Sequence, residues 1–192
     1  MKENSGVTNE QLRQYVLDDL TKARREAGLV ESKDWRAIGF GKHEKLTAPQ
    51  ILFTDPDWAF WKYEQMNARS TGACDLPELK LACERAMMLR IPDKYRGDVC
   101  AEYTFNVRSG SLERLAITQR SLVEPGDTVH VRDVIDMSMP RRFAGRSYDK
   151  GGYKRFLRDM KRIVLGWEGA RVSKREANEF FSDQANFAPG TK

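Results

Sequence analysis

The spacing of apolar residues changes twice along the chain, and these changes constrain the fold more than any other feature of the sequence. Two runs rich in β-branched and aromatic residues, 99–107 (VCAEYTFNV) and 112–119 (LERLAITQ), are separated by Arg108-Ser109-Gly110-Ser111. A loop this short that contains glycine is typical of an antiparallel hairpin. A third run, 128–137 (TVHVRDVIDM), follows a Pro-Gly turn, and its apolar and polar residues alternate in part. We therefore expect a three-stranded antiparallel meander between residues 98 and 137.

Helical signals lie on both sides of these strands. Before them, helix starts are predicted at Thr8, which has Gln11 three residues later, at Asp55-Pro56 and at Asp75-Leu76-Pro77. After them, apolar residues return at helical spacing over 148–167, and Ser173 is placed to cap a last short helix. The sequence therefore predicts an α+β fold, with N-terminal helices, a small three-stranded antiparallel sheet and then C-terminal helices.

The length of the chain permits more than one domain organisation. A chain of 192 residues is long enough for one domain or for two small lobes. Residues 91–97 (IPDKYRG) are the best candidate boundary. The first lobe, 1–95, would be mainly helical and contain a Gly-Lys-His segment, and the second, 96–192, would hold the β-meander and the basic helices. One continuous domain is the alternative.

Cysteine and histidine usage excludes several classes of protein. The three cysteines, Cys74, Cys83 and Cys100, cannot all pair with one another, and no Cys-x-x-Cys motif is present. The only histidines are His43 and His130, so we expect no closed zinc site and no cofactor. No apolar run approaches the ~18 residues of a membrane span, and the N-terminal sequence MKENSGVTNEQ has no apolar signal core. These features predict a soluble protein of the reducing cytoplasm that has no membrane partner.

The formal net charge of +5 is distributed unevenly along the chain. Residues 1–140 carry 20 Lys or Arg and 22 Asp or Glu, whereas residues 141–175 carry 12 and 3. A local basic segment is stronger evidence for a polyanionic partner than a uniformly high isoelectric point. We therefore expect the partner to be nucleic acid, with DNA favoured over RNA.

The basic side chains are spaced to form one cationic strip on a helix and on the loop before it. Apolar residues of the helix predicted over 148–167 fall on one side, so its basic residues must face solvent. Such a strip would neutralise phosphates without reading bases, and no helix-turn-helix or RNA-recognition motif is present. The residues that we expect to bind are Arg141, Arg142, Arg146, Lys154, Arg155, Arg158, Lys161 and Arg162.

These features predict a non-catalytic nucleic-acid-binding accessory protein that recognises mainly the phosphate backbone through residues 141–175. The alternative is an inhibitor or adaptor encoded by a bacterial phage or plasmid, which would bind an acidic protein surface through the same arginine-rich strip. A third interpretation is that the strip is only a solvated helix face. The sequence leaves these three interpretations open, together with the oligomeric state.

Residues 38–66 (IGFGKHEKLTAPQILFTDPDWAFWKYEQM) contain two short motifs. The first is Phe40-Gly41-Lys42-His43 followed by Thr47, and the second is Asp55-Pro56 followed by Trp58 and Trp61. This segment resembles the small C-terminal domain of exonuclease X-like proteins, which is also found in bacterial proteins described as quorum-sensing-regulated virulence factors. The sequence departs from that family at Glu44-Lys45-Leu46, where the family has a glycine before its lysine.

The glycine-containing loop of this segment is a secondary candidate site, made of Lys42, His43 and Lys45. Gly39 and Gly41 permit a tight turn with positive φ, and its N–H groups could hold a phosphate beside the lysines. The spacing is not that of a nucleotide-binding P-loop. The alternative is a tight hairpin in which His43 packs with the tryptophans as a small core.

We expect no catalytic site. The resemblance to exonuclease X-like proteins implies nuclease chemistry, which needs several carboxylates that converge on Mg²⁺. Asp133 and Asp136 lie in the third predicted strand with their side chains on opposite faces, so they cannot act as a pair. No Gly-x-Ser-x-Gly motif is present, and His130 is better explained as a sheet-face residue than as a base.

Overall fold

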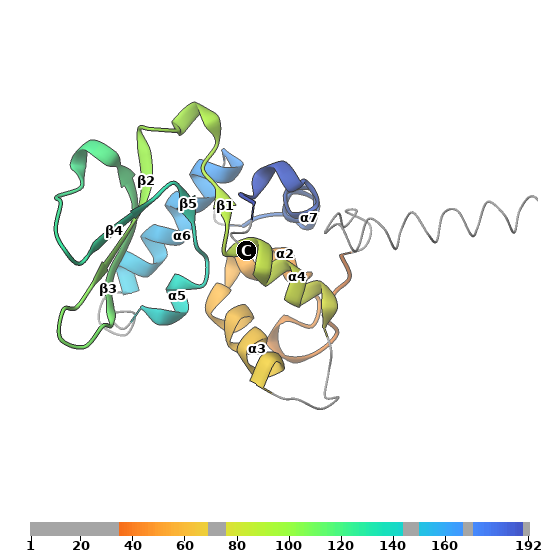
Figure 1. The fold of residues 1–192 in the computed structure, drawn as a ribbon. Helices are drawn as coiled ribbons and strands as arrows, with labels where there is room; N and C mark the ends of the chain where they lie inside the picture. Colours follow the sequence, from red (N-terminus) through yellow and green to blue (C-terminus); the bar gives the residue numbers. More distant parts are fainter. Residues whose placement is uncertain (1–34, 69–75, 144–149, 167–170, 190–192) are drawn as a thin grey trace, which may run out of the picture.

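The computed structural model describes residues 35–68, 76–143, 150–166 and 171–189. The fold of these residues is α+β, as predicted (Figure 1). The helices α2 (Ala48–Thr54), α3 (Pro56–Ala68) and α4 (Pro77–Ala86) precede a three-stranded sheet, and α5 (Met139–Arg142), α6 (Lys150–Leu165) and α7 (Lys174–Ser182) follow it. The helix predicted to start at Thr8 lies outside the described residues.

Capping side chains explain where two of the helices begin. Ser173 caps α7 as predicted, because its hydroxyl accepts a hydrogen bond from the Glu176 N–H while the Glu176 carboxylate accepts one from the Ser173 N–H. Thr47 and Gln50 form the same reciprocal pair at the start of α2, a helix that the sequence analysis did not separate from the glycine loop. Leu76 occupies the N-cap position of α4, and the cap predicted one residue earlier lies outside the described residues.

The three-stranded sheet contains β2 (Val99–Phe105), β3 (Leu112–Gln119) and β4 (Val129–Arg132). The predicted hairpin is confirmed, because β2 and β3 pair antiparallel from Val99↔Gln119 onward. The predicted meander is wrong: the order is β3-β2-β4, so β2 is the central strand and β4 lies on its far side. The connection 120–128 is long enough to cross the end of β2, and a meander would have required a tight turn there.

The predicted third strand is also divided into two parts. It leaves the sheet after Arg132, and β5 (Val134–Ile135) pairs with β1 (Leu89–Arg90), a strand from the end of the helical region. Burial explains the departure, because Ile135 and Met137 are fully buried and could not remain at an exposed sheet edge. The Tyr103 hydroxyl of β2 holds the departing segment by accepting a hydrogen bond from the Asp136 N–H, with a distance of 2.8 Å.

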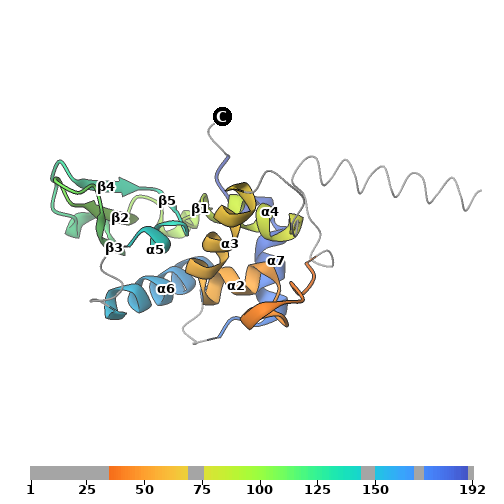
Figure 2. The same cartoon turned by 90° about the horizontal axis from the view of Figure 1, so that it is seen from below.

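Helix α6 forms a second layer against the sheet (Figure 2). As predicted, its apolar side faces the core, with Phe156, Met160 and Ile163 buried. Tyr103 of β2 and Leu115 of β3 are paired across the hairpin, so their side chains point to the same face of the sheet, and both are buried. The amphipathic sequence of α6 therefore fixes which side of the helix is exposed.

The C-terminal helix α7 packs among the N-terminal helices, although the sequence analysis assigned it to the second lobe (Figure 2). Phe180 and Phe181 pack edge-on against Phe53 of α2, with ring centroids 5.5 and 5.6 Å apart. The buried Thr47 hydroxyl donates a hydrogen bond to Asn178 Oδ1 over 2.7 Å. These contacts join the two ends of the described chain.

Residues after α7 extend this packing. The Ala188 N–H donates to the Met88 carbonyl over 2.8 Å, and Phe187 forms an isolated antiparallel bridge with Leu89. The guanidinium of Arg85, which is 6% exposed, donates to the Phe181 carbonyl and lies over the Phe187 ring. The buried hydrophobic residues form one cluster that contains residues from both sides of the predicted boundary at 91–97.

Candidate nucleic-acid interface

The exposed side of α6 carries most of the predicted cationic strip. Because the apolar side of the helix packs on the sheet, Lys154, Arg155, Arg158 and Arg162 all face solvent. Arg158 lies 3.3 Å from Asp159, between Nε and Oδ1, and its side chain is 65% exposed, so solvent weakens this ion pair. Within the described part of the chain, Lys154, Arg155 and Arg162 form no ion pair. The helix therefore presents available positive charge along one side.

Lys161 differs from its neighbours on α6. It is only half-buried, but partial removal from water lowers the pKa of its ammonium group below the usual value. Because it also has a partner in the structure, it is less available to a ligand than Arg158 or Arg162.

The two arginines that precede α6 lie in the short helix α5 and not in the predicted loop, and Arg141 is held by carboxylates. Its Nε lies 2.6 Å from Glu64 Oε2 and its Nη1 lies 3.3 Å from Asp57 Oδ1, both on α3. The Arg141 side chain is 25% exposed and joins α5 to α3, so its role as a free binding residue is not supported. Arg142 remains exposed, with its guanidinium 5.9 Å from the ring centroid of Phe105. Arg146 lies outside the described residues.

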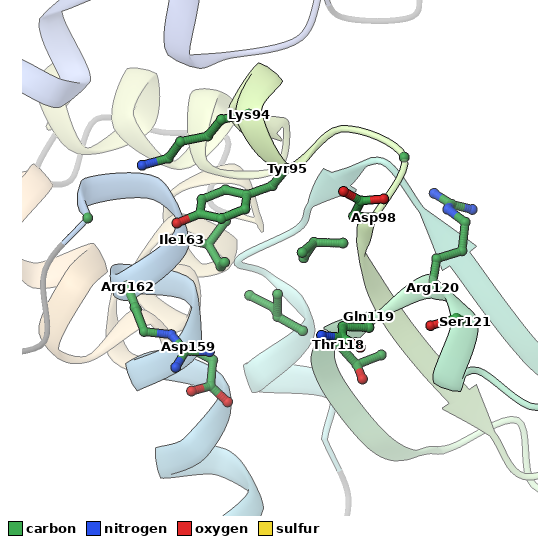
Figure 3. Close-up of a pocket in the computed structure, with 14 residues that line it drawn as sticks. Lys94, Tyr95, Asp98, Thr118, Gln119, Arg120, Ser121, Asp159, Arg162 and Ile163 are labelled. Atoms are coloured by element: carbon green, nitrogen blue, oxygen red, sulfur yellow. The ribbon is translucent and has the colours of Figure 1, made fainter.

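A groove of about 1050 Å³ lies beside the basic side of α6 (Figure 3). It is bounded by α6, by the turn Asp93–Tyr95 and by the end of β3 with the turn that follows it. Three cationic side chains line it: Lys94, Arg120 and Arg162. Only Arg162 is predicted from the sequence, because Lys94 and Arg120 lie far from the basic segment and are brought to it by the fold.

The secondary loop site is occupied by its own internal interactions. The Asp55 carboxylate lies 2.6 Å from Lys42 Nζ and 3.0 Å from His43 Nε2, and it accepts a hydrogen bond from the Trp58 N–H over 3.2 Å. Burial alone would raise the pKa of Asp55, but the hydrogen bonds from Lys42, His43 and Trp58 outweigh this effect and lower the pKa below the usual range. Lys45 is exposed.

Aromatic side chains pack around this carboxylate, which is the arrangement expected under the alternative of a small core. The His43 ring meets Trp58 edge-on at 5.0 Å between centroids, and Trp58 also contacts Phe40 and Trp61. Gly39 and Gly41 have φ of 75° and 67°, the left-handed conformation that the tight turn requires. The structure therefore brings Lys42 and His43 together around Asp55, where they stabilise the loop.

The remaining groups with potential chemistry are separate from one another. Asp133 is exposed and pairs with Arg120, whereas Asp136 is buried and accepts hydrogen bonds from the Ser138 N–H and hydroxyl, so the two carboxylates do not act together. His130 is exposed on β4 and meets the ring of Phe105 at 5.0 Å. Among the described residues, no group of His, Cys, Asp and Glu side chains is arranged to hold a metal ion.

The cysteines in the described residues are structural. Cys83 and Cys100 are buried and free, and Cys74 lies outside these residues. Burial raises the pKa of the Cys83 thiol, as expected for a small core residue of α4. None of the helices in the described ranges has the length and apolar composition needed to cross a membrane.

Comparison with protein-family models, with curated proteins and with solved structures gives no match for this chain. The resemblance of residues 38–66 therefore remains a prediction, and the evidence for function comes from the surface itself.

Proposed function

We propose that this chain is a non-catalytic nucleic-acid-binding accessory protein that contacts mainly the phosphate backbone, with DNA favoured over RNA. The observation that carries the proposal is the exposed side of α6, where Lys154, Arg155, Arg158 and Arg162 face solvent from a helix whose other side is anchored on the sheet. Side chains on a rigid helix lose less freedom on binding than the same residues on a mobile loop.

The length of this surface suits a run of phosphates. From Lys154 to Arg162 the helix rises by about 12 Å, at ~1.5 Å per residue. Phosphates along one strand of a duplex follow one another at about 3.4 Å along its axis, so the surface spans roughly three to four of them. Four cations over this length are enough to neutralise several phosphates and release their counterions.

The composition of α6 favours backbone contact because, apart from guanine, which Arg and Lys can also contact, it has few side chains that read bases. Its sequence, KGGYKRFLRDMKRIVL, contains no Asn or Gln, the side chains that pair with adenine in the major groove. Lys and Arg contact phosphates in any sequence. Affinity should therefore depend strongly on salt and weakly on sequence.

The proposal is tested by measuring the affinity for a random-sequence duplex over a series of salt concentrations. Lys154→Gln with Arg158→Gln should flatten the slope of log K against log salt by about 1.8, since each lost phosphate contact in duplex DNA contributes about 0.9. The matched control is Arg108→Gln with Lys80→Gln, which removes the same charge from two exposed residues, one in the β2–β3 loop and one on α4. Neither residue belongs to α6, so this control should reduce the slope less.

Two results would contradict the proposal. If no DNA or RNA binds with a steep salt dependence, or if the control pair has the larger effect, the α6 surface is not a phosphate-binding surface. The first result favours the alternative of a phage- or plasmid-encoded inhibitor or adaptor that binds an acidic protein surface. Unfolding curves should show that both variants remain within about 0.5 kcal/mol of the wild type, because the substituted side chains are exposed.

A further inference from the structure

The groove beside α6 has the size and the lining of a site for part of a nucleic-acid strand. Its volume of about 1050 Å³ is slightly above the range usual for ligand sites, about 300 to 1000 Å³. It is therefore large enough for one nucleotide, with neighbouring units of the strand passing through solvent. A base within a duplex could not enter it, because its Watson–Crick edge is occupied by the partner base and its faces are covered by stacking.

The floor and the rim of the groove have different chemistry. Val99, Ile117 and Ile163 give it an apolar floor, on which the face of an unpaired base would be removed from water. The side chains of Gln119 and Ser121 also line the groove and offer hydrogen-bonding groups to the polar edge of a base (Figure 3). An apolar surface with a few polar groups at its margin is typical of sites that bind planar rings.

Positive charge is concentrated on one side of the groove. Lys94, the Tyr95 hydroxyl and Arg162 lie on the side that faces α6, whereas Arg120 and Ser121 lie across from them (Figure 3). Arg120 forms an exposed ion pair with Asp133. Two carboxylates also line the groove: Asp98, which lies on the side of Arg120 (Figure 3), and Asp159, which forms the solvent-weakened pair with Arg158. Lys94 is exposed, and its Nζ lies 4.9 Å from the ring centroid of Tyr95.

We propose that this groove binds one nucleotide of a single strand, with the phosphate between Lys94 and Arg162 and the base on the apolar floor. The inference rests on the proposed function, because Arg162 belongs to both surfaces and a strand that follows the exposed side of α6 would reach the groove there. It adds a preference that the α6 surface alone does not give: single-stranded nucleic acid binds more tightly than duplex.

The test compares a short labelled oligothymidylate with a mixed-sequence duplex of equal length. Lys94→Glu should weaken binding of the single strand and flatten its salt slope by about 0.7, the contribution of one phosphate contact in a single strand. Duplex binding by the same variant should change little. The matched control is Lys80→Glu, an exposed lysine on α4 outside the groove, which should change neither affinity. Tyr95→Phe removes only the hydroxyl and keeps the partly buried ring in place. It should weaken binding of the single strand and leave duplex binding unchanged.

The outcomes separate this inference from the proposed function. If Lys94→Glu and Tyr95→Phe leave single-strand binding unchanged while Lys154→Gln with Arg158→Gln weakens it, the groove inference is wrong and the α6 surface stands. If Lys94→Glu weakens binding of the single strand and of the duplex equally, the groove does not select an unpaired base and the inference is also wrong. If thymidine monophosphate displaces the oligonucleotide at equal concentration, the groove is a site for a free nucleotide and not for a strand, and the inference is wrong. If no nucleic acid binds the wild type, both proposals fail.

Discussion

Substitution of Asp55 would test whether the glycine loop is a structural hub or a ligand site. In the structure its carboxylate is the common acceptor for Lys42, His43 and the Trp58 N–H. Asp55→Ala removes all three interactions, whereas Asp55→Asn keeps Oδ1, the oxygen that accepts from Trp58. The two variants together separate the helix cap from the charged interactions.

The expected magnitude follows from the exposure of each partner. The loss of a helix cap costs about 1 kcal/mol of the free energy of unfolding. The hydrogen bond to His43, which is 11% exposed, contributes about 1 kcal/mol. The ion pair with Lys42 contributes at most about 0.5 kcal/mol, because the lysine is 59% exposed and solvent screens it. We therefore expect Asp55→Ala to cost about 2 to 2.5 kcal/mol and Asp55→Asn about 1 to 1.5 kcal/mol.

The free energies should be measured by urea unfolding as a function of pH. The pKa of Asp55 is lowered in the folded state, so its charge stabilises the fold above its ordinary pKa of 3.8, and this stabilisation is lost as the pH falls through the lower folded value. The difference between wild type and Asp55→Asn should therefore be full near neutral pH and shrink in acid. Glu44→Ala, an exposed residue of the same loop, is the control and should have almost no effect.

Two results would refute this reasoning. If Asp55→Ala costs no more than Glu44→Ala, the carboxylate does not hold the loop. Asp55→Asn frees Lys42 and His43. If this variant binds DNA more tightly and with a steeper slope of log K against log salt, the glycine loop is a phosphate site. We expect the salt slope to stay unchanged.

Four further results are expected. Met160→Ala should cost about 2 to 5 kcal/mol in denaturant unfolding, because Met160 is fully buried between α6 and the sheet; a cost below about 1 kcal/mol would mean that α6 is not docked. Burial raises the pKa of Asp136, so wild-type stability should fall as the pH rises from 3.8 through the raised folded value, and Asp136→Asn should remove this fall; parallel stability curves would contradict it. Arg141→Met should leave the salt slope of DNA binding unchanged, because Asp57 and Glu64 already hold the guanidinium; a flatter slope would restore Arg141 to the binding surface. DNA incubated with the protein and Mg²⁺ or Mn²⁺ should stay intact in gel electrophoresis, and degradation that is abolished by one carboxylate substitution would show a nuclease.

Features that depend on neighbours in sequence were predictable. The β2–β3 hairpin follows from a loop of residues 108–111, and the exposed side of α6 follows from the period of its apolar residues. Ser173 caps α7 through residues only three positions away. In each case the interaction that decides the structure lies within a few residues, so the local pattern contains it.

Features that depend on distant pairing were not predictable. The connection 120–128 does not indicate on which side of β2 the next strand will pair, and β1 and β5 are too short to carry a pattern of their own. Arg141 looked available because its partners, Asp57 and Glu64, lie in a helix far back in the chain. The groove was missed for the same reason, since Lys94, Arg120 and Arg162 meet only after the sheet and α6 pack together.

The position of α7 among the N-terminal helices has a consequence for synthesis of the chain. A ribosome releases α2 and α4 long before it releases Phe180, Phe181 and Phe187, the rings that cover them. Until those last residues emerge, the nascent helices carry uncovered apolar surface and cannot complete their core. The hairpin can form during translation, whereas the helical part must wait until α7 and Phe187 have been synthesised. A stalled or shortened product should therefore be recognised by chaperones and proteases as unfinished.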